Sequence, residues 1–125
     1  SYCGWYWAVL EDCAKKTWES NYNKPIIMSE MGGGAKQGKF GTEDEIWTEE
    51  FQAAVYKYNL KMADNIDGLA GISPWILKDF LSPRRPLDGI QDGWNRKGLV
   101  SETGIKKKAW YELKAYYEAK VVDKE

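Results

Sequence analysis

Two short apolar runs limit the folds open to this chain: PIIMS at residues 25–29 and LAGISPWIL at residues 69–77. Neither run alternates apolar with polar residues, a pattern typical of strands that are buried on both faces of a parallel sheet. Pro25 is compatible with the first residue of a strand, and Pro74 indicates a bulge or the end of a strand. We therefore expect two parallel strands, each covered on both sides by other structure.

Three further stretches predict amphipathic helices, because apolar residues recur in them every three or four positions. They span residues 8–22, 48–65 and 105–120. Helical stretches therefore alternate with the apolar runs along the chain. This order predicts an α/β layer fold.

The two later helices carry further signals. Thr48 can cap the second helix, and Glu49 and Glu50 complement the helix dipole in its first turn. Gly104 punctuates the start of the third helix. The apolar stripe expected along the third helix consists of Ala109, Trp110, Leu113 and Tyr117.

Long segments follow both apolar runs, at residues 31–47 and 78–104, and the second shows no obvious secondary structure. Long connections in compact folds are usually functional, and in α/β folds they gather at the carboxyl ends of the strands. Two parallel strands cannot close a barrel, which takes eight strands and about 250 residues. Because the chain also opens at Ser1 among aromatic residues, we expect it to be the last quarter or third of a larger fold.

Composition narrows the possible chemistry. The 18 basic and 19 acidic residues are balanced, so nothing indicates a nucleic-acid or membrane partner, and no apolar run is long enough to span a bilayer. With no histidine, the chain cannot build a Ser-His or Cys-His nucleophile by itself. We expect neither a metal site nor a cofactor. Seven Trp and eight Tyr offer flat faces that suit sugar rings, although core packing uses aromatic residues as well.

Glu30 is the first candidate for a catalytic residue. It stands where the first apolar run ends and just before three glycines, Gly32, Gly33 and Gly34. Barrel enzymes place catalytic residues at the carboxyl ends of strands, and glycines permit a sharp turn and the close approach of a ligand. A surface carboxylate at an ordinary strand end would give the same pattern, so position alone leaves both readings open.

The stretch KPIIMSEMGGGA resembles the nucleophile segment of the family two glycoside hydrolases, which include β-glucuronidases, β-galactosidases and β-mannosidases. Three further segments resemble that family in the same order. They are SYCGWY, which resembles the signature Asn-x-Tyr-x-Gly-Trp-Tyr without its leading Asn; PWILKDF, which resembles the eighth-strand segment; and SPRRPL with WNRKGLVSETGIKKKAWYELKAYY, which resembles the closing loop and last helix. The resemblance implies that residues 1–125 are an incomplete C-terminal segment of a TIM-barrel catalytic domain. About the last two strands and three helices of an oligomeric parent enzyme would be present.

The same resemblance implies a retaining β-glycosidase with Glu30 as its nucleophile. Retaining glycosidases use two carboxylates about 5–5.5 Å apart, one as nucleophile and one as acid/base. In this family the acid/base is the Glu of an Asn-Glu pair, and no such pair occurs in this sequence. We expect the remainder of the barrel to supply it, so the chain alone should not hydrolyse glycosides.

Several aromatic and basic residues match substrate-contacting positions of the family. Tyr2 and Tyr6 match active-site tyrosines, one of which would hydrogen-bond the nucleophile and keep it ionised. Trp75 matches the tryptophan that floors the sugar site. Either Arg84 or Arg85 would lie on the closing loop beside the substrate, and the spacing does not decide which. Core packing for the aromatic residues and surface ion pairs for the arginines are the alternatives.

Asn95 and Lys97 resemble the Asn-x-Lys pair with which β-glucuronidases hold the carboxylate of their substrate. A lysine supplies a point charge, and an amide supplies a hydrogen bond. Some β-galactosidases of the family carry a similar segment, so a neutral sugar is the alternative, and a non-catalytic carbohydrate-binding module is another. We expect the lysine run at residues 106–108 to be a solvated helix face.

Overall fold

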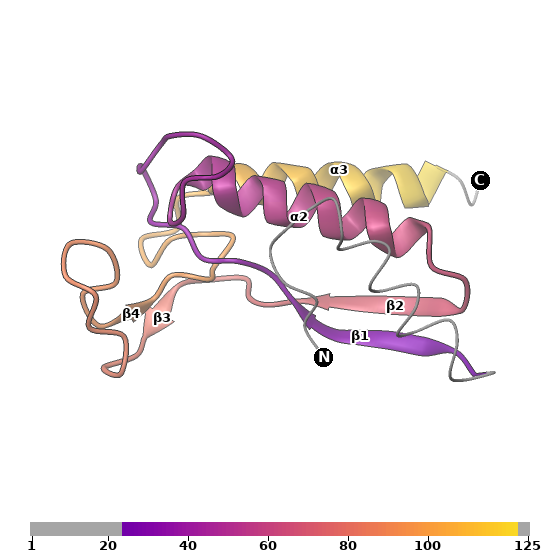
Figure 1. Ribbon diagram of the computed structural model, residues 1–125, viewed down its shortest axis with the longest axis horizontal. Coiled ribbons are helices and arrows are strands. Elements are labelled where there is room, and N and C mark those ends of the chain that lie inside the picture. The colour runs from indigo at the N-terminus through magenta and orange to yellow at the C-terminus, as the bar shows by residue number, and fades with distance from the viewer. Residues whose placement is uncertain (1–23, 123–125) are drawn as a thin grey trace.

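A computed structural model describes residues 24–122, which form a helical layer packed on a small sheet (Figure 1). The predicted α/β class is confirmed for this part of the chain, whereas the helix predicted at residues 8–22 lies outside it. In order, the elements are β1 (Ile26–Met31), α2 (Glu49–Asp64), β2 (Leu69–Pro74), β3 (Phe80–Leu81), β4 (Trp94–Asn95) and α3 (Lys108–Val122).

Strands β1 and β2 pair in parallel, as predicted, with Met28 opposite Ile72. Strand β1 continues two residues beyond the apolar run, so Glu30 is the last residue but one of the strand. Strand β2 ends at Pro74. Both strands point their carboxyl ends toward the part of the molecule that holds β3 and β4 (Figure 1). Glu30 and the segment after Pro74 are thereby brought to the same end of the sheet.

The expectation that both strands are buried on both faces is wrong for the described residues. Met28 and Met31 are buried in β1, but Ile27 is 68% exposed, and β2 contains no fully buried residue. Helices α2 and α3 lie together on one side of the strands (Figure 1). A parallel strand is buried on both faces only where a second layer covers it, and no described element does so here.

Helix α2 follows its sequence signals closely. The Thr48 hydroxyl oxygen accepts a hydrogen bond of 3.0 Å from the Phe51 backbone N–H, which makes Thr48 the N-cap as predicted. The helix is buried on more than one side because it packs against the strands and against α3. Buried apolar residues of both layers form one core: Met28, Met31, Tyr56, Leu60, Met62, Ile66, Leu99, Ala109 and Leu113.

Helix α3 begins at Lys108, three residues later than predicted. The preceding residues make other contacts: the Ile105 N–H donates to the Ser101 hydroxyl, and the Lys107 N–H donates to the Leu99 carbonyl. The predicted stripe is correct at Ala109 and Leu113 but wrong at Tyr117, which is exposed. Tyr116 packs against the core in its place.

The segment at residues 78–104 is ordered by hydrogen bonds rather than being without structure. Strands β3 and β4 pair antiparallel, and the Ser82 N–H donates to the Gly93 carbonyl at 2.7 Å just beyond them. Two-residue strands carry no periodic pattern, which is why sequence inspection does not find them. Across residues 24–122, no helix has the length and apolar character needed to cross a membrane.

Candidate active site

A pocket of about 390 Å³ opens at the carboxyl end of β1. Its charged lining residues are Glu30 and Lys97, which are 67 positions apart in sequence. Its remaining lining consists of Gly32, Gly33, Gly34, Ile46, Trp47 and Phe51. The pocket is thus bounded by an acidic and a basic group, by a glycine backbone and by an apolar wall, and its size lies within the range of small-molecule sites.

The three glycines are needed for close packing beside the pocket. Gly32 has a φ of +151°, and a Cβ there would overlap the Trp75 carbonyl oxygen. A Cβ on Gly34 would lie 2.6 Å from the Trp47 ring. The sharp change of direction predicted from these glycines is present, and the room they make is used partly by neighbouring protein atoms.

Trp47 forms part of the apolar wall and was not identified from the sequence. Its φ of +73° is uncommon for a bulky side chain and marks a site where surrounding structure dictates the backbone. The Trp47 carbonyl accepts a 3.0 Å hydrogen bond from the Lys36 N–H, which fixes this residue beside the glycine segment. No signal in the sequence indicates this backbone conformation at Trp47.

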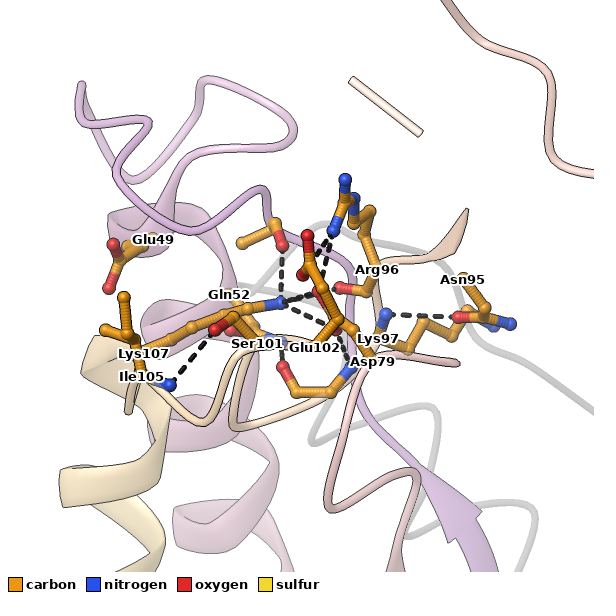
Figure 2. Close-up of polar contacts among 12 residues, drawn as sticks. Glu49, Gln52, Asp79, Asn95, Arg96, Lys97, Ser101, Glu102, Ile105 and Lys107 are labelled. Carbon is orange, nitrogen blue, oxygen red and sulfur yellow. Dashed lines mark hydrogen bonds and ion pairs between the residues drawn. The ribbon is translucent and has the colours of Figure 1, made fainter. Parts of the chain in front are cut away.

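Asn95 and Lys97 lie together, as their spacing predicts. The Asn95 side-chain oxygen accepts a hydrogen bond of 3.0 Å from the Lys97 backbone N–H, and Asn95 is buried (Figure 2). Asn95 therefore supports the backbone turn at Lys97, and only its NH₂ group is left to donate to a ligand.

Four predicted site residues in the described part of the chain do not line the pocket: Trp75, Arg84, Arg85 and Asn95. Trp75 follows β2 directly, is 36% exposed, and packs edge-on against Phe80 with ring centroids 6.3 Å apart. Arg84 and Arg85 are exposed on the loop between β3 and β4. Tyr2 and Tyr6 lie outside the described residues. No group of acidic, cysteine or histidine side chains in residues 24–122 could hold a metal ion.

An ion-pair cluster adjoins Lys97; we define it as the buried Asp79, Arg96 and Lys107 together with the partly exposed Glu102 (Figure 2). The Lys107 ammonium donates to both Asp79 carboxylate oxygens at 2.8 and 3.0 Å, and Arg96 pairs with Glu102 at 2.7 Å and with Asp79 at 3.4 Å. Two positive and two negative groups thus face one another with no net charge.

The cluster corrects the expectation that residues 106–108 are a solvated face, because Lys107 is fully buried. Burial raises the pKa of the Asp79 carboxyl and lowers that of the Lys107 ammonium group, while their mutual contact opposes both shifts. Lys106 and Lys108 are exposed, as expected. A run of three lysines carries no signal that distinguishes its middle member, so sequence inspection missed both Lys107 and its partner Asp79.

Known proteins similar to this chain include two curated relatives. A putative β-glucuronidase of Formosa agariphila is 28% identical over 82% of the chain, and a β-glucuronidase of Streptococcus agalactiae is 32% identical over 78% of it. The chain spans 11% and 16% of their respective lengths. No protein-family model matches the chain.

Solved structures show the same likeness in three dimensions. A family two β-galacturonidase from Eisenbergiella tayi bound to galacturonate superposes with a TM-score of 0.73 at 26% identity, over 83% of this chain and 19% of that one. A β-D-glucuronidase for Dictyoglomus thermophilum gives a TM-score of 0.75 at 25% identity, over 94% and 21%. The resemblance to family two glycoside hydrolases is confirmed.

The four proteins named above match 78–94% of this chain, whereas the chain covers only 11–21% of each of them. Four segments carried the resemblance in the sequence. The described part of the chain contains three of them, and two of these contribute to the pocket, through Glu30 and Lys97. The family likeness and the pocket therefore point to the same region of the molecule.

Proposed function

We propose that this chain is the C-terminal part of the TIM-barrel catalytic domain of a retaining β-glycosidase that cleaves terminal β-glucuronides. The observation that carries the proposal is the shared pocket of Glu30 and Lys97. A carboxylate at the end of a strand and an ammonium group across one cavity suit a sugar ring that carries its own carboxylate.

In the proposed reaction, the Glu30 carboxylate attacks the anomeric carbon and forms a covalent glycosyl-enzyme intermediate. A second carboxylic acid protonates the departing glycosidic oxygen, and the same group then deprotonates the water that releases the sugar. That second carboxylate belongs to the remainder of the barrel. The chain alone would therefore bind part of a substrate without turning it over.

Substrate recognition in this proposal depends on Lys97. Its ammonium group would pair with the uronate carboxylate, and the Asn95 NH₂ group would add a hydrogen bond. The named relatives favour this choice, since glucuronides and galacturonides both carry the carboxylate of a uronic acid. Trp75 and one of Arg84 and Arg85 are proposed to border the sugar, and Tyr2 and Tyr6 to bond the nucleophile.

The test uses the full-length protein that carries these residues, assayed with aryl β-glucuronide and aryl β-galactoside. Glu30→Gln should lower kcat by roughly a thousandfold or more, because the attacking group is lost. The exposed Glu43→Gln is the matched control and should match the parent. Full activity in Glu30→Gln would remove Glu30 as nucleophile and favour a non-catalytic carbohydrate-binding role.

The sugar preference is tested with Lys97→Met. A charge-assisted hydrogen bond is worth about 1.5–3 kcal/mol, so glucuronide kcat/KM should fall roughly 10- to 100-fold while galactoside kcat/KM changes little. Lys61→Met, on the exposed side of α2, is the control. Equal losses on both substrates would favour a neutral sugar.

A further inference from the structure

The backbone on both sides of Lys97 is held by buried polar groups. Before it, the Arg96 carbonyl accepts hydrogen bonds from the Ala35 N–H at 2.9 Å and from the Lys107 ammonium at 3.2 Å. After it, the Gly98 N–H donates to Asp79 at 2.8 Å, and the Gly98 carbonyl accepts from the Gln52 amide at 2.9 Å. Lys97 therefore projects from a segment with little freedom to shift.

The same side chains hold the opposite wall of the pocket. Gln52 donates its second amide hydrogen to the Gly33 carbonyl at 2.9 Å, and Lys107 donates to the Ala35 carbonyl at 2.6 Å. Gln52 and Lys107 thus each bridge residues 33–35 and the segment around Lys97. The spacing between the two walls is thus set by side chains that do not line the pocket themselves.

The Lys107 ammonium group and Gly98 both have little room to move in these bridges. The Lys107 ammonium has three N–H groups and lies within hydrogen-bonding distance of four oxygens, so all of its protons are used. A Cβ on Gly98 would overlap the Asp79 backbone N and side chain, so the two segments can meet only through a glycine. Uncharged side chains would fill the same space at a lower desolvation cost, and in some proteins a buried ion pair fixes a specific geometry rather than adding stability.

We propose that Lys107, with Asp79 and Gln52, is a positioning residue that holds Lys97 at the distance from Glu30 at which the carboxylate of a uronic acid substrate is bound. This inference rests on the proposed function. It adds to the proposed binding site residues that act on substrate recognition without touching the substrate. Loss of Lys107 should therefore act on the recognition of the carboxylate more than on the general integrity of the pocket.

The test compares Lys107→Met with its exposed neighbour Lys106→Met in the full-length protein. For Lys107→Met, the ratio of kcat/KM on aryl β-glucuronide to that on aryl β-galactoside should fall at least tenfold, mainly through a higher KM for the glucuronide. Lys106→Met should keep the parental ratio. In a Lys97→Met background, adding Lys107→Met should leave the ratio unchanged, because the group being positioned is already gone.

A purely structural role predicts something different: both substrates would lose activity together and the ratio would stay at its parental value, which would overturn the inference. Where Lys107→Met does not yield folded protein, Gln52→Met decides the question. It removes one bridge without unpairing a buried charge, and the same tenfold fall in the ratio is expected. A parental ratio in Gln52→Met would overturn the inference.

A binding measurement separates this inference from the proposed reaction. If the parent cleaves neither glycoside, the proposed function fails, and the affinity for free D-glucuronate, measured by calorimetry, becomes the criterion. Binding that weakens at least tenfold in Lys107→Met but not in Lys106→Met supports the positioning role. Absent binding, or equal binding in all three proteins, overturns it.

Discussion

Replacing Lys107 with methionine should be among the most destabilising single changes in the described part of the chain. The substitution keeps a long side chain but removes the ammonium group from a fully buried position. The Asp79 carboxylate, also fully buried, would keep only the Gly98 N–H and the 3.4 Å pair with Arg96. Breaking a buried ion pair in this way costs about 3–5 kcal/mol. The remaining Arg96 contact places the expected loss near the lower end, at about 3 kcal/mol.

Urea-induced unfolding followed by tryptophan fluorescence measures this loss. A typical urea dependence of about 1–3 kcal/mol per molar converts 3 kcal/mol into a midpoint shift of at least about 1 M. Lys106→Met removes only an exposed cation–π contact with the Trp110 ring, 4.1 Å from its centroid, and should cost no more than about 1 kcal/mol. The double variant Asp79→Leu/Lys107→Met should lose less than the sum of the single variants, because no buried charge is then left unpaired. A loss below about 1 kcal/mol in Lys107→Met would refute the argument.

Two further perturbations address the backbone and the docking of the helices. Gly32→Ala should lower the free energy of unfolding several times more than Gly38→Ala. Both glycines have positive φ, but a Cβ at Gly32 would overlap the Trp75 carbonyl, whereas a Cβ at Gly38 would meet nothing within 4 Å. At Gly38 only the backbone cost of about 1–2 kcal/mol applies. Equal unfolding midpoints for the two variants would contradict this. Asp64 accepts hydrogen bonds from Tyr116 and Lys120, and these bonds join α2 to α3. The contact with Asp64 raises the pKa of Lys120, whereas the pKa of Tyr116 is raised mainly by burial and secondly by Asp64. A group whose pKa is raised on folding stabilises the fold at pH values below its unfolded pKa, and this contribution is lost as the pH rises through its folded pKa. Asp64→Asn should therefore lower the free energy of unfolding by less than about 1 kcal/mol at pH 7, and its difference from the parent should shrink above about pH 10. A difference that does not vary with pH would count against this contact.

Sequence reasoning succeeded where a local pattern carries the structural information. The cap at Thr48 and the helical spacing behind it predict α2 to within a residue at each end. The apolar run before Glu30 predicts a strand, and parallel pairing with the second run brings the carboxyl ends together. Glu30 and Lys97 line one pocket because Glu30 lies near the carboxyl end of β1, and Lys97 lies on the long segment that follows β2.

Sequence reasoning failed where a long-range contact decides the structure. Lys107 and Lys106 are identical in type, and only the position of Asp79 in the fold determines which of the two is buried. The late start of α3 has the same origin, since Lys107 is held by Leu99 and the ion-pair cluster before the helix begins. Trp47 reaches the pocket through a backbone conformation that no propensity rule assigns to tryptophan.

The measurement that most directly tests the proposed chemistry is covalent trapping of the nucleophile. The full-length protein would be incubated with a 2-deoxy-2-fluoro-β-glucuronyl fluoride, which slows breakdown of the glycosyl-enzyme intermediate, and digested for peptide mass spectrometry. The account predicts one added sugar on the peptide that carries Glu30, and no label in Glu30→Gln. A label on any other carboxylate, or continued turnover of the probe without a label, would contradict it.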